Sequence, residues 1–116
     1  SHAAASRELY GEDRHIVDCV IENVEAAPIS AKMKALLNIA GKVQQSGKHV
    51  TEGDINKARE QGAGDRDIHD TVLIAAAFSM FNRYVDGLAS FTPTDPMLYE
   101  EMGKRMTTIG YVLPQV

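Results

Sequence analysis

The sequence predicts an all-α protein. Apolar residues recur at three- and four-residue spacing in one segment after another, which is typical of amphipathic helices. No segment alternates apolar and polar residues over more than four positions, as a half-buried strand would. Capping residues and turns separate the helical segments at short intervals. We therefore expect one domain over residues 1–116, with five or six helices joined by short connections.

Two helices are expected in the N-terminal quarter. The first covers the alanine-rich residues 3–10 and ends at Gly11, a residue suited to the position after a helix. Asp13 is placed to cap a second helix, which Pro28 terminates. The apolar face of this second helix consists of Ile16, Val17, Val20, Ile21 and Val24.

The sequence pattern in the middle of the chain predicts a third and a fourth helix. Ser30 opens the third, which runs to residues 46–47 with apolar residues on one face. Thr51, with Asp54 three residues later, approximates a capping box for a short fourth helix that ends near Gly62.

The longest helix is expected over residues 68–88. It is apolar nearly all round between residues 72 and 81, so its own core or another subunit must cover it on every side. A final helix is expected over residues 97–109, with Pro96 in its first turn. A short tail with Tyr111 and Pro114 follows.

Composition and charge exclude several classes of protein. The single cysteine, Cys19, excludes an internal disulfide and a cysteine-based zinc finger. A net charge of −4 argues against a nucleic-acid-binding surface. The longest apolar stretch is about ten residues, half of the roughly 20 that span a bilayer, and the N-terminus does not resemble a signal peptide. We expect a cytoplasmic protein without nucleic-acid or membrane partners.

Few residues fit a chemical template. Cys19 has acidic rather than basic neighbours, so we interpret it as a small hydrophobe and not as a reactive thiol. The four histidines show no metal-binding spacing, and His69 is expected to lie at the surface or to cap its helix. No phosphate-binding loop or serine-based motif is present, and we expect neither a cofactor nor a metal ion.

A polar cluster interrupts the long apolar helix. Asn82 and Asp86 are four residues apart and share a helix face, with Arg83 and Tyr84 between them. Such side chains need partners if they are buried. They are expected to form a structural network that fixes helix packing, or else to line a pocket or a subunit contact.

Two stretches of the chain resemble a known family. The first is residues 68–88, with Ile-His-Asp-Thr-Val-Leu-Ile-Ala-Ala-Ala-Phe followed by Phe-Asn-Arg-Tyr-Val-Asp-Gly-Leu. The second is residues 35–65, with Ala-Leu-Leu-Asn-Ile-Ala-Gly-Lys-Val, Val-Thr-Glu-Gly-Asp and Gly-Ala-Gly-Asp in the same order and spacing. These stretches resemble the second half of the carboxymuconolactone decarboxylase and alkyl hydroperoxidase D superfamily, in particular its peroxidase-related branch. The resemblance extends more weakly to the N-terminus.

The resemblance implies an all-helical protomer that assembles into trimers or hexamers through apolar helices. Redox-active members of the family carry a Cys-x-x-Cys pair, followed by x-x-x-His and assisted by an upstream glutamate. In them the histidine and the glutamate relay protons, while the cysteines reduce a peroxide and become a disulfide.

Residues 1–7, Ser-His-Ala-Ala-Ala-Ser-Arg, resemble the end of this motif. His2 is then the motif histidine and the candidate catalytic residue, and the cysteine pair and the glutamate are expected upstream of Ser1. No cysteine role is carried onto Cys19. The competing interpretation, in which Ser1 and His2 remain from an affinity tag, stays open.

The resemblance implies a thiol peroxidase, or a related oxidoreductase, that acts on a peroxide or another small molecule as a homo-oligomer. Two alternatives stay open. One is the cofactor-free decarboxylation of a lactone, and the other is a homo-oligomeric helical module without turnover.

Overall fold

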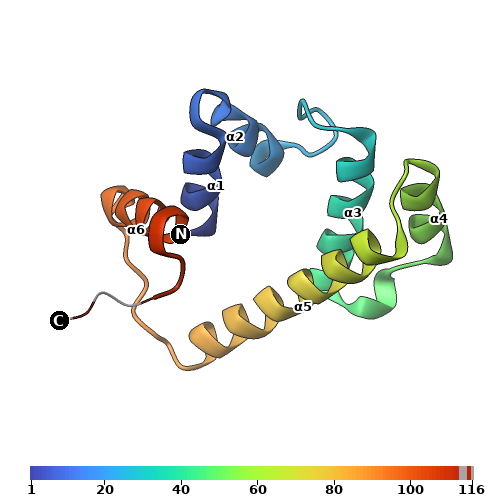
Figure 1. The fold of residues 1–116 in the computed structure, drawn as a ribbon. Coiled ribbons are helices and arrows are strands. Elements are labelled where there is room, and N and C mark those ends of the chain that lie inside the picture. The colour runs from blue at the N-terminus through green and yellow to red at the C-terminus, as the bar shows by residue number, and fades with distance from the viewer. Residues whose placement is uncertain (113–114, 116) are drawn as a thin grey trace. The chain divides into compact units, whose positions relative to one another are not determined.

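The computed structural model describes residues 1–112 and 115. Within them the chain forms six α-helices and two short 3₁₀ helices and has no strand, which confirms the all-α prediction (Figure 1). The elements are α1 (His2–Tyr10), η1 (Gly11–Asp13), α2 (His15–Glu22), α3 (Ala31–Gln45), η2 (Gly47–His49), α4 (Glu52–Glu60), α5 (Asp65–Gly87) and α6 (Pro96–Ile109). They group into two compact units, so the expectation of a single domain stays a prediction. Unit 1 comprises residues 1–28 and the segment from Phe91 onward, and unit 2 comprises residues 29–90.

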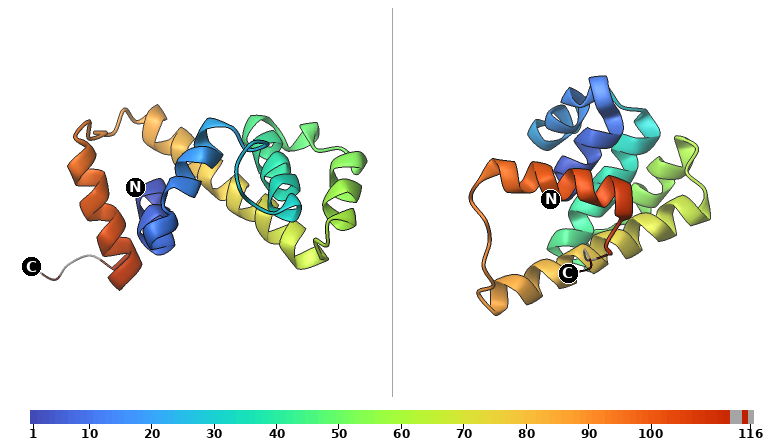
Figure 2. Two further views of the ribbon diagram at one scale, coloured as in Figure 1. Left: turned by 90° about the horizontal axis from the view of Figure 1, so that it is seen from above. Right: turned by 60° about the vertical axis from the view of Figure 1, so that its left-hand side comes forward.

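In unit 1, the first and the last helix of the chain pack against each other. α1 and α6 lie side by side in both views of Figure 2. Small residues permit this close packing: Ala4 and Ala5 of α1 are buried, and so is Gly103 of α6. α2 packs against α1 and completes the unit.

Unit 2 is built on α3, which packs against both α4 and α5. Its core is apolar and has Ile39 at its centre, with no exposed surface. The buried members of this core are Ala35, Leu36, Ile39, Ala58, Ala63 and Ile68. Leu36 and Ala58 belong to apolar faces that the sequence predicts, whereas Ile39 is not on a predicted face and Ala63 lies between α4 and α5.

The start and the end of α2 differ from the prediction. Asp13 does not cap α2, because the chain first makes the 3₁₀ turn η1, and the helix begins at His15 without a side-chain cap. α2 also ends at Glu22 and does not continue to Val24. The side chain of Asn23 accepts hydrogen bonds from the backbone N–H groups of Glu25 and Ala26, at 3.0 and 3.3 Å, and this turn replaces the helix.

The predicted caps of α3 and α4 are confirmed. Ser30 Oγ accepts the N–H of Met33 at 3.0 Å. Thr51 and Asp54 form the reciprocal capping box at the start of α4. Figure 1 shows α3 and α4 as neighbouring helices of unit 2.

The long helix α5 begins three residues earlier than predicted, at Asp65. The carboxylate of Asp67 accepts the Gly64 N–H at 2.9 Å, which stabilises this earlier start. Pro96 lies in the first turn of α6 as predicted, and Asp95 caps that helix. Pro114 lies outside the described residues.

Within unit 2, α5 is not covered on every side. Ile68 is buried, and Val72 packs on the core of unit 2. Leu73, Ile74 and Phe81 of the same helix are more than half exposed. Despite these apolar side chains, no helix among residues 1–112 is both long and apolar enough to cross a bilayer.

Candidate functional site

His2, the candidate catalytic residue, is the first residue of α1 and bonds to the other end of the chain. Its Nε2 atom lies 2.9 Å from the hydroxyl oxygen of Tyr111. The two rings are 6.0 Å apart between centroids and tilted by 38°. Both residues are exposed, so this hydrogen bond lies at the surface of unit 1.

The packing of α1 against α6 brings these two residues together. Gly110 ends α6 with φ = 66°, a left-handed conformation that favours glycine. The chain turns there, and Tyr111 follows at once. Since the tight contact of Gly103 with Ala4 fixes the distance between the two helices, the position of Tyr111 relative to His2 depends on this contact.

The surroundings of His2 favour its neutral form. Partial burial of the imidazole lowers the pKa of His2. Nδ1 lies 3.4 Å from Ser1 Oγ, at the N-terminal end of the helix. A neutral imidazole at physiological pH can accept a proton, as a general base must.

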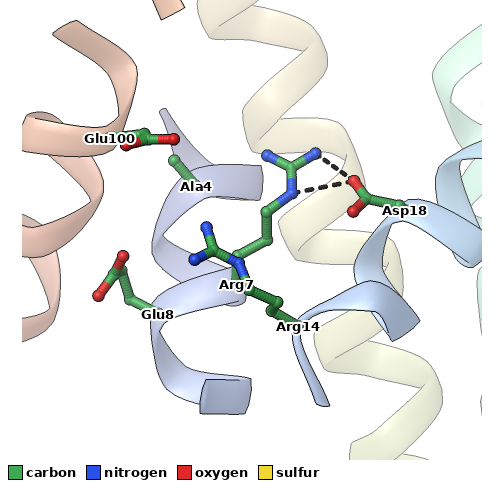
Figure 3. Close-up of a pocket in the computed structure, with 6 residues that line it drawn as sticks. All are labelled: Ala4, Arg7, Glu8, Arg14, Asp18 and Glu100. Atoms are coloured by element: carbon green, nitrogen blue, oxygen red, sulfur yellow. Dashed lines mark hydrogen bonds and ion pairs between the residues drawn. The ribbon is translucent and has the colours of Figure 1, made fainter. Parts of the chain in front are cut away.

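A second polar contact of unit 1 joins α1 to α2. Nη2 and Nε of Arg7 donate to the same carboxylate oxygen of Asp18, at 2.6 and 3.0 Å. Figure 3 shows this pair beside a cavity of about 290 Å³. The cavity is lined by Ala4, Arg7, Glu8, Arg14, Asp18 and Glu100. Since two arginines face three carboxylates, the cavity does not select for anions.

A larger cavity of about 440 Å³ lies beside the start of α1. It is lined by Ser1, Ala3, Ala4, Arg7, Thr94, Pro96, Tyr99 and Glu100. Ser1 and Ala3 are the two chain neighbours of His2. His2 itself is not among the lining residues, and the volume of the cavity is in the range that holds small ligands.

The other residues considered from the sequence do not gather into a site. Cys19 of α2 is half-buried, as expected of a small hydrophobe, and His15 at the start of the same helix is exposed. His49 lies in η2 near Gln45, and His69 bonds to the adjacent Asp70 at 3.1 Å on the surface. Among residues 1–112 and 115, no group of three or more histidine, cysteine or acidic side chains could hold a metal ion.

The polar cluster of α5 does not form the expected buried network. Asn82, Arg83, Tyr84 and Asp86 are all exposed. Of the four, Arg83 reaches α3, where it donates to the Gln44 carbonyl at 3.5 Å. These four side chains therefore form no buried network within unit 2, and the other expectation, a pocket or a subunit contact, stays a prediction.

Sequence reasoning missed Tyr111 as a partner of His2. The two residues are 109 positions apart, and no local pattern connects them. It also missed the pairing of Arg7 with Asp18, which depends on the angle between α1 and α2. The contact between His2 and Tyr111 has one local indication in the sequence. Tyr111 directly follows Gly110, which ends a helix, so a polar aromatic residue lies at that helix end.

Comparisons with protein-family models, curated proteins and solved structures give no match for this chain. The resemblance to the alkyl hydroperoxidase D-like superfamily therefore stays a prediction from the residues quoted above.

Proposed function

We propose that the chain is part of an alkyl hydroperoxidase D-like thiol peroxidase. In this proposal His2 is the proton-transfer residue, and the Cys-x-x-Cys pair lies upstream of Ser1. The protein is cytoplasmic and reduces a small organic or inorganic peroxide. The observation that carries the proposal is the state of His2, a histidine in the motif position whose partial burial favours the neutral imidazole.

The proposed reaction consumes one peroxide and two thiols. His2 accepts the proton of the attacking thiol, and the resulting thiolate attacks one peroxide oxygen. The O–O bond breaks, the cysteine becomes a sulfenic acid, and the leaving alkoxide takes the proton from His2 to give an alcohol. The second thiol then attacks the sulfenic acid, releasing water and forming the disulfide. A dithiol reductant restores the two thiols by exchange.

The positions of the groups around His2 support this role. Nε2 of His2 bonds to the Tyr111 hydroxyl, while Nδ1 is directed toward the Ser1 hydroxyl. The cavity lined by Ser1 and Ala3 provides space for a small peroxide beside the start of α1.

The exposed side of α5 supports assembly into a homo-oligomer. Leu73, Ile74 and Phe81 are each more than half exposed, and all lie on α5. Exposed apolar surface of this density is typical of a protein interface. A second copy of the chain that covers it restores the burial that the sequence pattern requires.

Peroxide consumption by the full-length protein, with a dithiol reductant present, tests the proposal. We expect turnover of a small organic hydroperoxide and a loss on the order of 100-fold in His2→Gln. His15→Gln is the matched control, because His15 is an exposed histidine of the same unit and lies outside the proposed site. No turnover by an intact oligomer would contradict the proposal and would favour the lactone decarboxylase or the non-catalytic module.

A further inference from the structure

The cavity of about 290 Å³ in unit 1 collects charged side chains that the proposed function does not use. We propose that it binds a small zwitterion of the α-amino-acid type, with the ammonium group on Glu8 and Glu100 and the carboxylate on Arg14. All of the residues that line the cavity belong to unit 1. The inference goes beyond the thiol peroxidase proposal and does not depend on it.

One ion pair forms a wall of this cavity. Arg7 donates from Nη2 and Nε to one carboxylate oxygen of Asp18, at 2.6 and 3.0 Å. The pair holds the Arg7 side chain, which is 28% exposed, against α2. Because the opposite charges of a close pair largely cancel at a distance, Arg7 and Asp18 shape the cavity more than they attract a charged ligand.

Three further charged side chains line the cavity: Glu8 of α1, Glu100 of α6 and Arg14 at the start of α2. Among residues 1–112 and 115, none of these three side chains is in an ion pair. Two carboxylates and one guanidinium therefore remain to pair with a ligand. A zwitterion offers a partner to both signs at once, which neither a simple anion nor a simple cation does.

The packing of α1 against α6 sets where the two carboxylates lie. Glu8 follows Ala4 by four residues on α1. Glu100 precedes Gly103 by three residues on α6. These spacings place each carboxylate on the helix face that makes the close contact between Gly103 and Ala4. Figure 3 shows the Glu100 carboxylate directed toward Ala4, while the Arg14 side chain extends toward α1.

The volume and the charge balance limit the ligand. The cavity, at about 290 Å³, is close to the lower end of the range for small-molecule sites, roughly 300 Å³. Once an ammonium and a carboxylate are paired, one cavity carboxylate is left for a basic ligand side chain. We therefore expect L-lysine to bind more tightly than L-alanine. L-glutamate should bind least, because its side chain adds a second negative charge.

Isothermal titration calorimetry of the full-length protein with these three amino acids tests the proposal. The affinity for L-lysine should fall on the order of tenfold in Glu100→Gln and in Arg14→Gln, since each substitution removes one charge-assisted hydrogen bond to the ligand. It should also fall as the salt concentration rises, because the lining side chains are partly exposed.

Glu101→Gln is the matched control, because Glu101 is the next residue of α6, is exposed and does not line this cavity. It should leave the affinity for L-lysine unchanged. Thermal unfolding of each variant checks that unit 1 stays folded. Absence of saturable L-lysine binding to the wild-type protein, or equal affinities for L-lysine and L-glutamate, would overturn the proposal. An equal loss in Glu101→Gln and Glu100→Gln would overturn it too, because binding would then follow the overall charge of the protein.

Discussion

Gly103 of α6 lies so close to α1 that a Cβ atom at this position would come within 2.7 Å of the carbonyl carbon of Ala4. The same atom would lie 2.9 Å from the Ala4 Cβ and 2.9 Å from the Ala5 nitrogen. Two of these three atoms belong to the backbone of a helix and cannot move aside. The approach of α1 and α6 therefore requires a glycine on one side, and through it the contact between His2 and Tyr111 is maintained.

Replacing Gly103 with alanine should destabilise unit 1. The added methyl group forces the two helices apart, at a cost of about 1–3 kcal/mol in the free energy of unfolding. Thermal unfolding measures the change as a Tm lower by several degrees. Gly41→Ala is the control, because Gly41 is an exposed residue of α3 where a Cβ meets nothing within 4 Å. It should stabilise the protein by about 0.5–1 kcal/mol, and an equal effect of the two substitutions would contradict the packing argument.

Asp54 should make the stability of unit 2 dependent on pH. Its carboxylate binds the Lys42 ammonium with both oxygens at 2.7 Å and accepts the Thr51 N–H at 2.8 Å. The Lys42 contact first, and the Thr51 backbone second, hold the pKa of Asp54 far below its usual range. Because the pKa is lower in the folded protein than in the unfolded chain, the stabilisation is complete above about pH 4 and is lost as the pH falls further.

Urea unfolding of wild type and Asp54→Asn at pH 7 and pH 3 measures this effect. We expect a lower midpoint for the variant at pH 7 and a smaller difference at pH 3. Asp86→Asn is the control, because it changes a carboxylate on the exposed last turn of α5. Its urea midpoint should equal that of wild type at both pH 7 and pH 3. A difference for Asp54→Asn that is the same at pH 7 and pH 3 would contradict the role of the Lys42 pair.

A charged residue on the exposed side of α5 should disrupt the proposed oligomer. Ile74 is 57% exposed in one chain, and Ile74→Asp places a carboxylate in an interface that excludes water. Sedimentation velocity should show the assembly shift toward the single protomer. Ile21 is 64% exposed on α2 and gives a matched variant, Ile21→Asp, which should keep the assembly. A wild-type protein that sediments as a single protomer would rule out the oligomer.

The pH–rate profile of peroxide turnover should reflect the environment of His2. Burial of the imidazole lowers the pKa of His2, so the basic form persists below pH 6.5, the ordinary value for histidine. Turnover should therefore fall only at a pH below this value. The acid limb should be absent in His2→Gln, whose residual rate does not depend on this group. A limb that persists unchanged in His2→Gln would assign the titration to another residue.

Local chemistry predicted most of the fold. The capping residues Ser30 and Thr51 gave the starts of α3 and α4, because a cap depends on residues only three positions apart. Predictions failed where two local signals compete. Asp13 lies in a 3₁₀ turn and does not cap α2. The Asn23 side chain bonds to the backbone of the next turn, and α2 ends before Val24.

The candidate site could be predicted only in part. His2 was identified through the motif that the first residues resemble, but its partner Tyr111 lies 109 positions away. Contacts of this kind depend on how two helices cross, which no local periodicity encodes. The polar cluster at Asn82 illustrates the opposite case, since a pattern that looked buried lies on an exposed helix end.

Counting thiols in the full-length protein tests the thiol peroxidase proposal most directly. The reduced protein is treated with one equivalent of an organic hydroperoxide, denatured and alkylated, and its intact mass is measured. The proposal predicts that two cysteines are protected as a disulfide while Cys19 still takes up one alkyl group. An unchanged number of alkylated cysteines, with the peroxide unconsumed, would contradict it.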